Sequence, residues 1–277
     1  MKGYYENDAI HAGMAPTDLA YVVSQYDGEI AFSDSLVGEI LDALGRLRIA
    51  SETLVLVTSD HGEEFFEHGR KGHRTTLYDE AILVPFIVKG PGVRPTPEGI
   101  DRQVSLIDVA PTLLGAAGLA AHPEMMGEDL GSLLSGRAGR EGPRLRGANG
   151  SDAAPRWAGA AEQGGTLRPA PYAVSQLVGG HETGDPCPRF SVRAPNRKSI
   201  TDECSGRADY FDLVRDPGEK EAVASEPSEE AGRFLASCRA IREAVGEMAH
   251  ALPREGTQPV TIDPELAARL RALGYLE

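Results

Sequence analysis

Tryptophan and cysteine are scarce in this chain, and long apolar runs are absent. Its 277 residues include 1 Trp and 3 Cys, and no stretch of about 18 apolar residues that could cross a membrane as a helix. Cys187, Cys204 and Cys238 are widely separated and form no Cys-x-x-Cys pair, which disfavours a zinc knuckle or a disulfide framework. A single Cys187–Cys204 disulfide stays open as an alternative to free thiols.

Excess positive charge is also lacking. The chain has 42 acidic and 28 basic residues and a formal net charge of -14. Nucleic acids are bound by clustered Lys and Arg, so we expect no nucleic-acid partner and favour a small substrate. Residues 1–10 lack the charged and apolar segments of a secretory signal. A cytoplasmic location is therefore the default, unless a signal lies upstream of Met1.

The first half of the chain predicts an α/β fold. Apolar residues from Leu19 to Leu47 recur at spacings of mostly three and four, which indicates an amphipathic helix. The β-branched apolar run Thr53–Ser59 is typical of a strand buried on both faces, and Val84–Val88 indicates another strand. We therefore expect a mostly parallel sheet in which Thr53–Ser59 is central and the helix packs on one face.

Composition divides the chain into three parts. Residues 1–136 are predicted to form the α/β domain, and residues 137–170, rich in Gly, Ala and Arg, a linker or surface excursion. Residues 171–277 are predicted to form a C-terminal subdomain with helices over residues 229–251 and 264–276. Its small antiparallel sheet is expected from three short strand candidates, Tyr172–Leu177, Phe190–Arg193 and Asp209–Leu213.

Asp60 and His61 directly follow the predicted central strand. Ligands usually bind at the carboxyl edge of an open α/β sheet. A carboxylate oxygen and an imidazole nitrogen at that edge could both face a divalent cation. The alternative is that Asp60 caps a turn and His61 is an ordinary polar loop residue.

The wider context resembles the sulfatase family of the alkaline phosphatase superfamily. The resemblance is carried by Ser59–Glu80 with the following Val84-Pro-Phe-Ile-Val88. Further matching stretches are Tyr26–Ile30, Val104–Leu114, Met126–Leu134, Tyr210–Glu219 and Asp263–Tyr275. The resemblance covers nearly the whole chain but only the later part of a family member. It implies an incomplete alkaline phosphatase/sulfatase-like fold and metal-assisted hydrolysis of sulfuric esters.

The resemblance assigns roles to four residues. Asp60 and His61 match the pair that binds a divalent cation in the family, most often Ca²⁺, with Mg²⁺ or Mn²⁺ as alternatives. Arg74 stands where family members usually have a lysine that contacts the sulfate oxygens. His73 could contact the ester oxygen or protonate the leaving alkoxide. Glu63 and His68 of the same loop are expected to be ordinary polar residues, with a role in orienting the ligands as the alternative, and Lys71 is expected to be an ordinary polar residue.

The chain departs from the family at the nucleophile. Family members carry Cys-x-Pro-x-Arg or Ser-x-Pro-x-Arg, whose first residue becomes formylglycine, and this sequence contains neither. Cys187-Pro188-Arg189 has similar residues at the wrong spacing. The paired aspartates of the first family strand are also missing. We therefore expect a fragment that lacks an N-terminal half and is inactive alone.

Two other functions stay open. A phosphodiesterase, a phosphonate-ester hydrolase or a phosphoethanolamine transferase of the same superfamily shares the Asp-His-Gly segment and differs in the missing nucleophile. A non-catalytic remnant could instead bind an anion or a partner chain. For the leading hypothesis, the expected substrate is a small-molecule or glycan sulfate ester.

Overall fold

The chain folds into a mixed α/β structure, with three small antiparallel sheets among the described residues. The computed structural model describes residues 7–122, 125–136, 172–177, 187–223 and 229–251. Its helices are α1 (Pro16–Arg46), α2 (Asp79–Ile82), the 3₁₀ turn η1 (Leu106–Asp108), α3 (Val109–Ala116), α4 (Gly131–Leu134) and α5 (Glu229–Ala251). Its strands are β1 (Val55–Thr58), β2 (Glu64–Phe65), β3 (Lys71–Gly72), β4 (Phe86–Lys89), β5 (Ala173–Leu177), β6 (Arg189–Ala194), β7 (Arg197–Asp202) and β8 (Ala208–Asp212).

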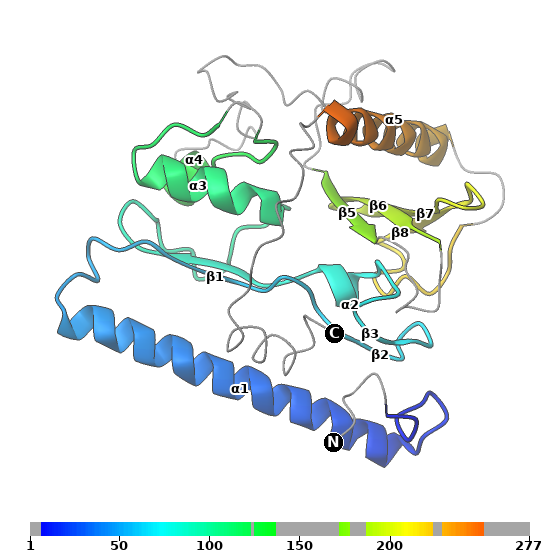
Figure 1. Cartoon of the computed structure of the whole chain (residues 1–277), viewed down its shortest axis with the longest axis horizontal. Coiled ribbons are helices and arrows are strands. Elements are labelled where there is room, and N and C mark those ends of the chain that lie inside the picture. Colours follow the sequence, from blue (N-terminus) through cyan, green and yellow to red (C-terminus); the bar gives the residue numbers. More distant parts are fainter. Residues whose placement is uncertain (1–6, 123–124, 137–171, 178–186, 224–228, 252–277) are drawn as a thin grey trace, which may run out of the picture.

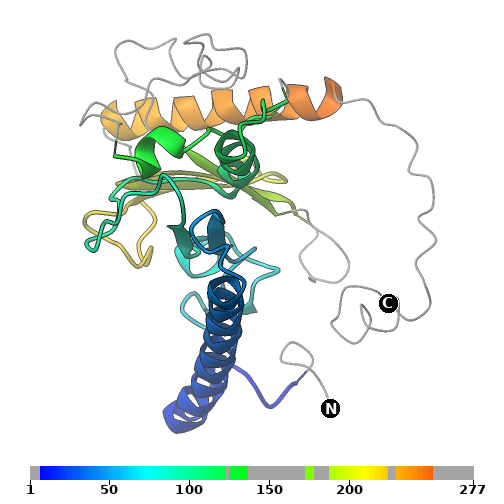
Figure 2. The same ribbon diagram turned by 90° about the vertical axis from the view of Figure 1, so that its left-hand side faces the viewer.

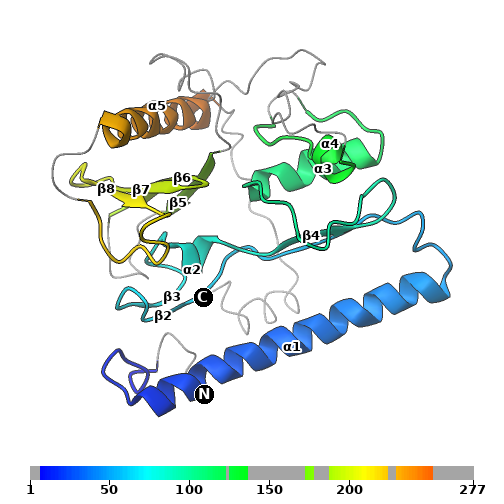
Figure 3. The same ribbon diagram turned by 180° about the vertical axis from the view of Figure 1, so that it is seen from behind.

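Helix α1 confirms the amphipathic helix predicted near the N-terminus. It begins at Pro16, whose fixed φ suits the first turn of a helix. The helix runs alongside the β1–β4 pair (Figures 1 and 3), yet none of its residues is buried. Some of its apolar side chains are exposed, for example Tyr21 at 66% and Ile40 at 57%, whereas a stripe that includes Val22, Val37 and Leu41 is half-buried. The helix therefore covers its apolar stripe only in part, and its packing on the face of a sheet stays a prediction.

Strand β1 pairs with β4 in antiparallel register, with Val55 opposite Lys89 and Thr58 opposite Phe86. The expected parallel pairing of this strand is thus wrong for the described residues. A parallel neighbour has to be reached through a crossover connection. Between β1 and β4 the chain instead reverses direction, and residues 7–15 contain no strand before α1. The α/β class and the C-terminal antiparallel sheet agree with the sequence prediction.

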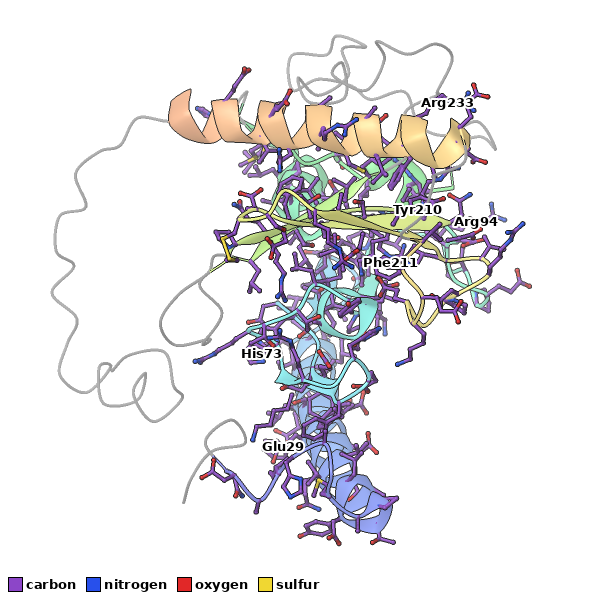
Figure 4. The ribbon with its side chains drawn as sticks, turned by 90° about the vertical axis from the view of Figure 1, so that its right-hand side faces the viewer. Glu29, His73, Arg94, Tyr210, Phe211 and Arg233 are labelled. Carbon is purple, nitrogen blue, oxygen red and sulfur yellow. A yellow bond between two sulfur atoms is a disulfide. The ribbon has the colours of Figure 1, made fainter. Side chains whose placement is uncertain are left out.

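The main hydrophobic core lies on both faces of the sheet β5-β6-β7-β8. One face packs against α5, which lies over the sheet in Figure 2, and buries Phe190 and Val192. The other face buries Phe211 together with Leu77 of the loop before α2. Tyr210 and Phe211 therefore point to opposite faces, as Figure 4 shows. The segment that precedes α2 is held against this sheet.

A disulfide joins Cys187 to Cys204 across the open end of the β6–β7 hairpin, with the two Cα atoms 5.5 Å apart. The structure thus decides the alternative that the sequence left open. The composition shift at 137–170 and the helix expected over 264–276 lie outside the described residues, so the domain boundaries stay predictions. None of the described helices combines the length and the apolar composition needed to cross a membrane.

Candidate active site

The end of β1 presents Asp60 and His61 at the surface. The hydroxyl of Ser59 donates a 2.7 Å hydrogen bond to the carbonyl oxygen of His61, and the amide of His61 donates a 3.0 Å bond to Asp60 Oδ1. These local bonds fix the turn that follows the strand. The side chain of Asp60 is 70% exposed and that of His61 is 38% exposed. Both groups are therefore accessible to a ligand.

The hydrogen bonding of His61 sets which ring nitrogen is available. His61 Nδ1 lies 2.8 Å from the carbonyl oxygen of Gly62. A carbonyl oxygen only accepts, so Nδ1 carries the proton when the ring is neutral, and Nε2 keeps its lone pair. Nε2 lies 3.6 Å from Asp60 Oδ2. A nitrogen and an oxygen donor therefore stand side by side, as two ligands of one divalent cation would. The donor set fits part of a cation's coordination shell.

His73 comes to the same place from the loop after β3. Its ring stacks on that of His61, with the centroids 3.5 Å apart and the planes 20° from parallel. His73 Nδ1 lies 2.9 Å from Glu63 Oε2, and both side chains are largely buried. An ionised Glu63 can only accept, so it holds the proton on Nδ1 and leaves Nε2 available for proton exchange. Figure 4 labels His73 on the loop between α1 and the C-terminal sheet.

The β2–β3 hairpin, which lies beside these residues in the chain, is held by buried hydrogen bonds. Glu64 is completely buried, and its Oε1 accepts hydrogen bonds from the amides of His68 (3.0 Å) and Arg70 (2.9 Å). Helix α1 reaches the hairpin through Tyr26, whose ring meets Phe65 edge-on at 5.3 Å. Burial, followed by the charge of Glu63, raises the pKa of Tyr26. The phenol beside the hairpin therefore stays neutral.

A hollow in the surface lies away from this polar cluster. A hollow of about 560 Å³ is lined by residues that include Ala50, Lys89 and Pro95. It lies at the start of β1, because Lys89 is paired with Val55, whereas Asp60 follows the other end of that strand. The hollow and the polar cluster are therefore separate features.

Comparisons with known proteins agree on one family. The family model described as Sulfatase matches residues 2–119. Arylsulfatase K of Mus musculus is 30% identical over 203 residues, which make up 73% of this chain and 32% of the mouse protein.

Residues 2–119 belong to the sulfatase family.

The fold of the chain is similar to that of solved sulfatase structures and their neighbours. The structure of a 2-O GAG sulfatase matches with a TM-score of 0.62 at 22% identity, covering 87% of this chain and 46% of its own. A phosphonate monoester hydrolase from Silicibacter pomeroyi matches with a TM-score of 0.58 at 22% identity, covering 79% and 40%. The chain thus spans about a third of the mouse relative and less than half of each solved structure.

The structure brings most of the residues singled out in the sulfatase motif together. His61 contacts both Asp60 and His73, and Arg74 follows His73 in a partly buried position. Cys187 is bonded to Cys204, so Cys187-Pro188-Arg189 is not a nucleophile segment of the family type.

Sequence reasoning underestimated Glu63. It was expected to be an ordinary loop residue or an orienting partner, and it directly contacts His73. The signal was the hairpin itself, in which Glu64 pairs with Gly72 and so places Glu63 opposite His73. A ligand atom from each of His61, Glu63 and His73 lies within 4.8 Å of the other two.

Proposed function

We propose that this chain supplies part of the catalytic site of a sulfuric ester hydrolase. In this proposal Asp60 and His61 bind a divalent cation, with Ca²⁺ favoured over Mg²⁺ or Mn²⁺. Arg74 contacts the sulfate oxygens, and His73 contacts the ester oxygen and protonates the leaving alkoxide. The substrate is a small-molecule or glycan sulfate ester. The bound cation would supply positive charge to the sulfate oxygens.

The observation that carries the proposal is the contact between two oriented histidines. His61 has its Nε2 beside the Asp60 carboxylate, and its ring stacks on His73, which Glu63 orients. A cation ligand and a proton donor therefore stand at the same surface, as hydrolysis of a sulfate ester requires. The guanidinium of Arg74, next in sequence, can bind an oxyanion through two parallel hydrogen bonds.

The nucleophile has to come from outside this sequence. A formylglycine residue, which the family uses, requires a Cys or Ser motif that the chain does not contain. We infer that an N-terminal half completes the site and that the 277-residue chain alone does not turn over an aryl sulfate. The exposed apolar side chains of α1, such as Ile30 at 53% and Phe32 at 59%, support a larger assembly.

Cation binding tests the assignment without requiring turnover. Titrating the chain with Ca²⁺ in a calorimeter should give binding that Asp60→Asn weakens at least about tenfold, because it removes a charged ligand. Asp34→Asn on α1 removes the same charge away from the site and should leave the affinity unchanged. Equal binding by all three proteins would reject Asp60 as a ligand and favour the non-catalytic alternative.

A phosphonate or phosphate ester hydrolase is the second candidate, because a phosphonate monoester hydrolase shares the fold. The experiment is to co-express the chain with the N-terminal half of a related sulfatase and a formylglycine-generating enzyme. The two ester classes are then compared on the purified complex. Preferential hydrolysis of an aryl sulfate supports the proposal, and preferential hydrolysis of an aryl phosphonate supports the second candidate. In both cases Asp60→Asn should lower the rate.

A further inference from the structure

Cationic side chains from the C-terminal sheet reach the segment that follows His73 and Arg74. Arg189 Nη1 donates a 2.5 Å hydrogen bond to the carbonyl oxygen of Thr75. At the other end of the segment, Arg193 Nη2 donates to Asp79 Oδ2 over 2.8 Å, and its Nε contacts both carboxylate oxygens at 3.0 and 3.1 Å. The segment 75–79 is therefore bound at both ends to β6.

Lys198 of β7 binds the same segment through Asp79. Its side chain is fully buried, and its Nζ lies 3.0 Å from Asp79 Oδ1 and 2.7 Å from Glu219 Oε1. Glu219 Oε2 in turn accepts a 2.6 Å hydrogen bond from the amide of Asp79, the first residue of α2. A buried ammonium is tolerated only when its charge is matched. Both carboxylates lie within ion-pair distance of Lys198, and Asp79 also accepts a hydrogen bond from it.

Glu219 adopts a backbone conformation that is unusual for its residue type. Its φ is 51°, and its side chain is 1% exposed. A non-glycine residue stays in the left-handed region only where its surroundings impose that conformation. The side chain of Glu219 is held in this position by its ion pair with Lys198 and by the hydrogen bond from the Asp79 amide.

Glu219 also contacts His68, in the loop that precedes His73. The carbonyl oxygen of Glu219 lies 3.0 Å from His68 Nε2, which must donate to it, and His68 Nδ1 lies 2.5 Å from Glu80 Oε1. The ring of His68 stacks on Tyr78, with centroids 3.5 Å apart. One buried network thus fixes both the loop before His73 and the segment after Arg74.

We infer that Lys198 is a positioning residue: through Asp79 and Glu219 it holds segment 75–79 so that His73 and Arg74 face the Asp60–His61 pair. The network acts by fixing the backbone before His73 and after Arg74. The inference rests on the proposed function only for what His73 and Arg74 do. The stacking of His61 on His73, which the inference explains, is formed within this chain and needs no other protein.

The test uses the imidazole NMR signals of the full chain with labelled histidine. In the wild type the stacked rings of His61 and His73 should shift each other's signals upfield, and His73→Gln assigns the His73 peak. Lys198→Met replaces the ammonium by an unbranched apolar side chain that is one atom shorter, so the upfield shifts should be lost while circular dichroism still reports a folded chain. Lys198→Arg, which keeps the charge, should restore part of the shift.

Val192→Ala is the matched control, because Val192 is buried on β6 but faces α5 rather than Asp79. It should lower stability without moving the His73 signal. The inference is overturned if Lys198→Met leaves the His73 signal in place, or if Val192→Ala moves it equally. If Lys198→Met does not fold, Arg193→Gln replaces it, because Arg193 binds the same Asp79 carboxylate and its side chain is 16% exposed. Arg193→Gln should also move the His73 signal, and an unchanged signal would overturn the inference.

The readout requires no cation, nucleophile or turnover. Loss of Ca²⁺ binding or of sulfate-ester specificity would therefore reject the proposed function without touching this inference. An unchanged His73 signal in Lys198→Met would reject the inference alone.

Discussion

The amide of Gly62 donates a 2.8 Å hydrogen bond to the carbonyl oxygen of Ala81. The backbone after Asp60 and His61 thus lies directly against α2, and a Cβ atom at Gly62 would collide with the carbonyl oxygen of Glu80. Only glycine permits two backbones to approach so closely. This contact joins the end of β1 to the helix that the C-terminal sheet holds in place.

Gly62→Ala should therefore push the end of β1, with Asp60 and His61, away from α2. We expect unfolding in urea to become easier by about 1–3 kcal/mol, since the clash is with backbone atoms that cannot rotate away. Ca²⁺ affinity, measured by calorimetry, should fall as well because Asp60 and His61 shift. Gly28→Ala in α1, where no atom lies within 4 Å of the added methyl group, should be neutral or stabilising by up to about 1 kcal/mol. Equal effects of the two substitutions would contradict the close-approach argument.

Asp79→Asn should destabilise the chain in a pH-dependent way. Burial alone raises the pKa of Asp79, but hydrogen bonds and charge from Arg193 and Lys198 outweigh it and leave the pKa below the ordinary 3.8. The stabilisation by this carboxylate is thus fully present above 3.8 and is lost as the pH falls through the lower folded value. Breaking a buried ion pair typically costs about 3–5 kcal/mol.

Urea unfolding of wild type and Asp79→Asn between pH 7 and pH 3 measures this effect. The difference in the free energy of unfolding should be constant down to about pH 5. It should then shrink, because the Asp79 carboxyl takes up its proton in the unfolded chain at a higher pH than in the folded chain. Asp212→Asn, at a partly exposed position of β8, is the control. A difference that grows toward acid would contradict the lowered pKa.

The sequence predicted the elements whose hydrophobic pattern is regular. The spacing from Leu19 to Leu47 gave α1, and the β-branched run at Thr53–Ser59 gave β1. The motif also placed Asp60, His61, His73 and Arg74 in one loop region, because they are near one another along the chain. Their metal, acid and anion-binding roles stay predictions.

What the sequence could not predict depends on contacts between distant residues. Strand β7 went unpredicted because Lys198, at an inward position, is buried by its ion pairs rather than by apolar packing. Glu219 lies 140 residues beyond Asp79, so no local pattern connects the two. The parallel sheet was wrong for β1 among the described residues because hydrophobicity predicts burial of a strand but not the direction of its neighbour.

The Cys187–Cys204 disulfide should stabilise the β6–β7 hairpin, which carries Arg189, the residue that donates a hydrogen bond to Thr75. Cys187 and Cys204 are separated by 17 residues, and closing a loop of this size in the unfolded chain is worth roughly 3 kcal/mol. The double variant Cys187→Ser, Cys204→Ser should lose about that much in urea unfolding. Reductant should lower the Tm of the wild type and leave that of the double variant unchanged. A reductant-insensitive wild type would mean that the bond does not contribute.

Cys238 should be a thiol that reacts only when α5 leaves the sheet. Its side chain is 5% exposed and packs with Phe190, Val192 and Ile241. Burial raises the pKa of the thiol to about 12, and the thiolate is the nucleophile toward alkylating reagents. At pH 8 and under native conditions iodoacetamide should leave Cys238 unmodified, whereas in urea one equivalent should react while the Cys187–Cys204 bond stays closed. Mass spectrometry of the quenched samples measures this, with Cys238→Ala as the unlabelled control.

Because Val192→Ala weakens the packing of α5 on the same face of the sheet, it should speed native labelling of Cys238 by allowing α5 to open more often. Rapid labelling of the folded wild type would instead show that α5 does not cover this face of the sheet.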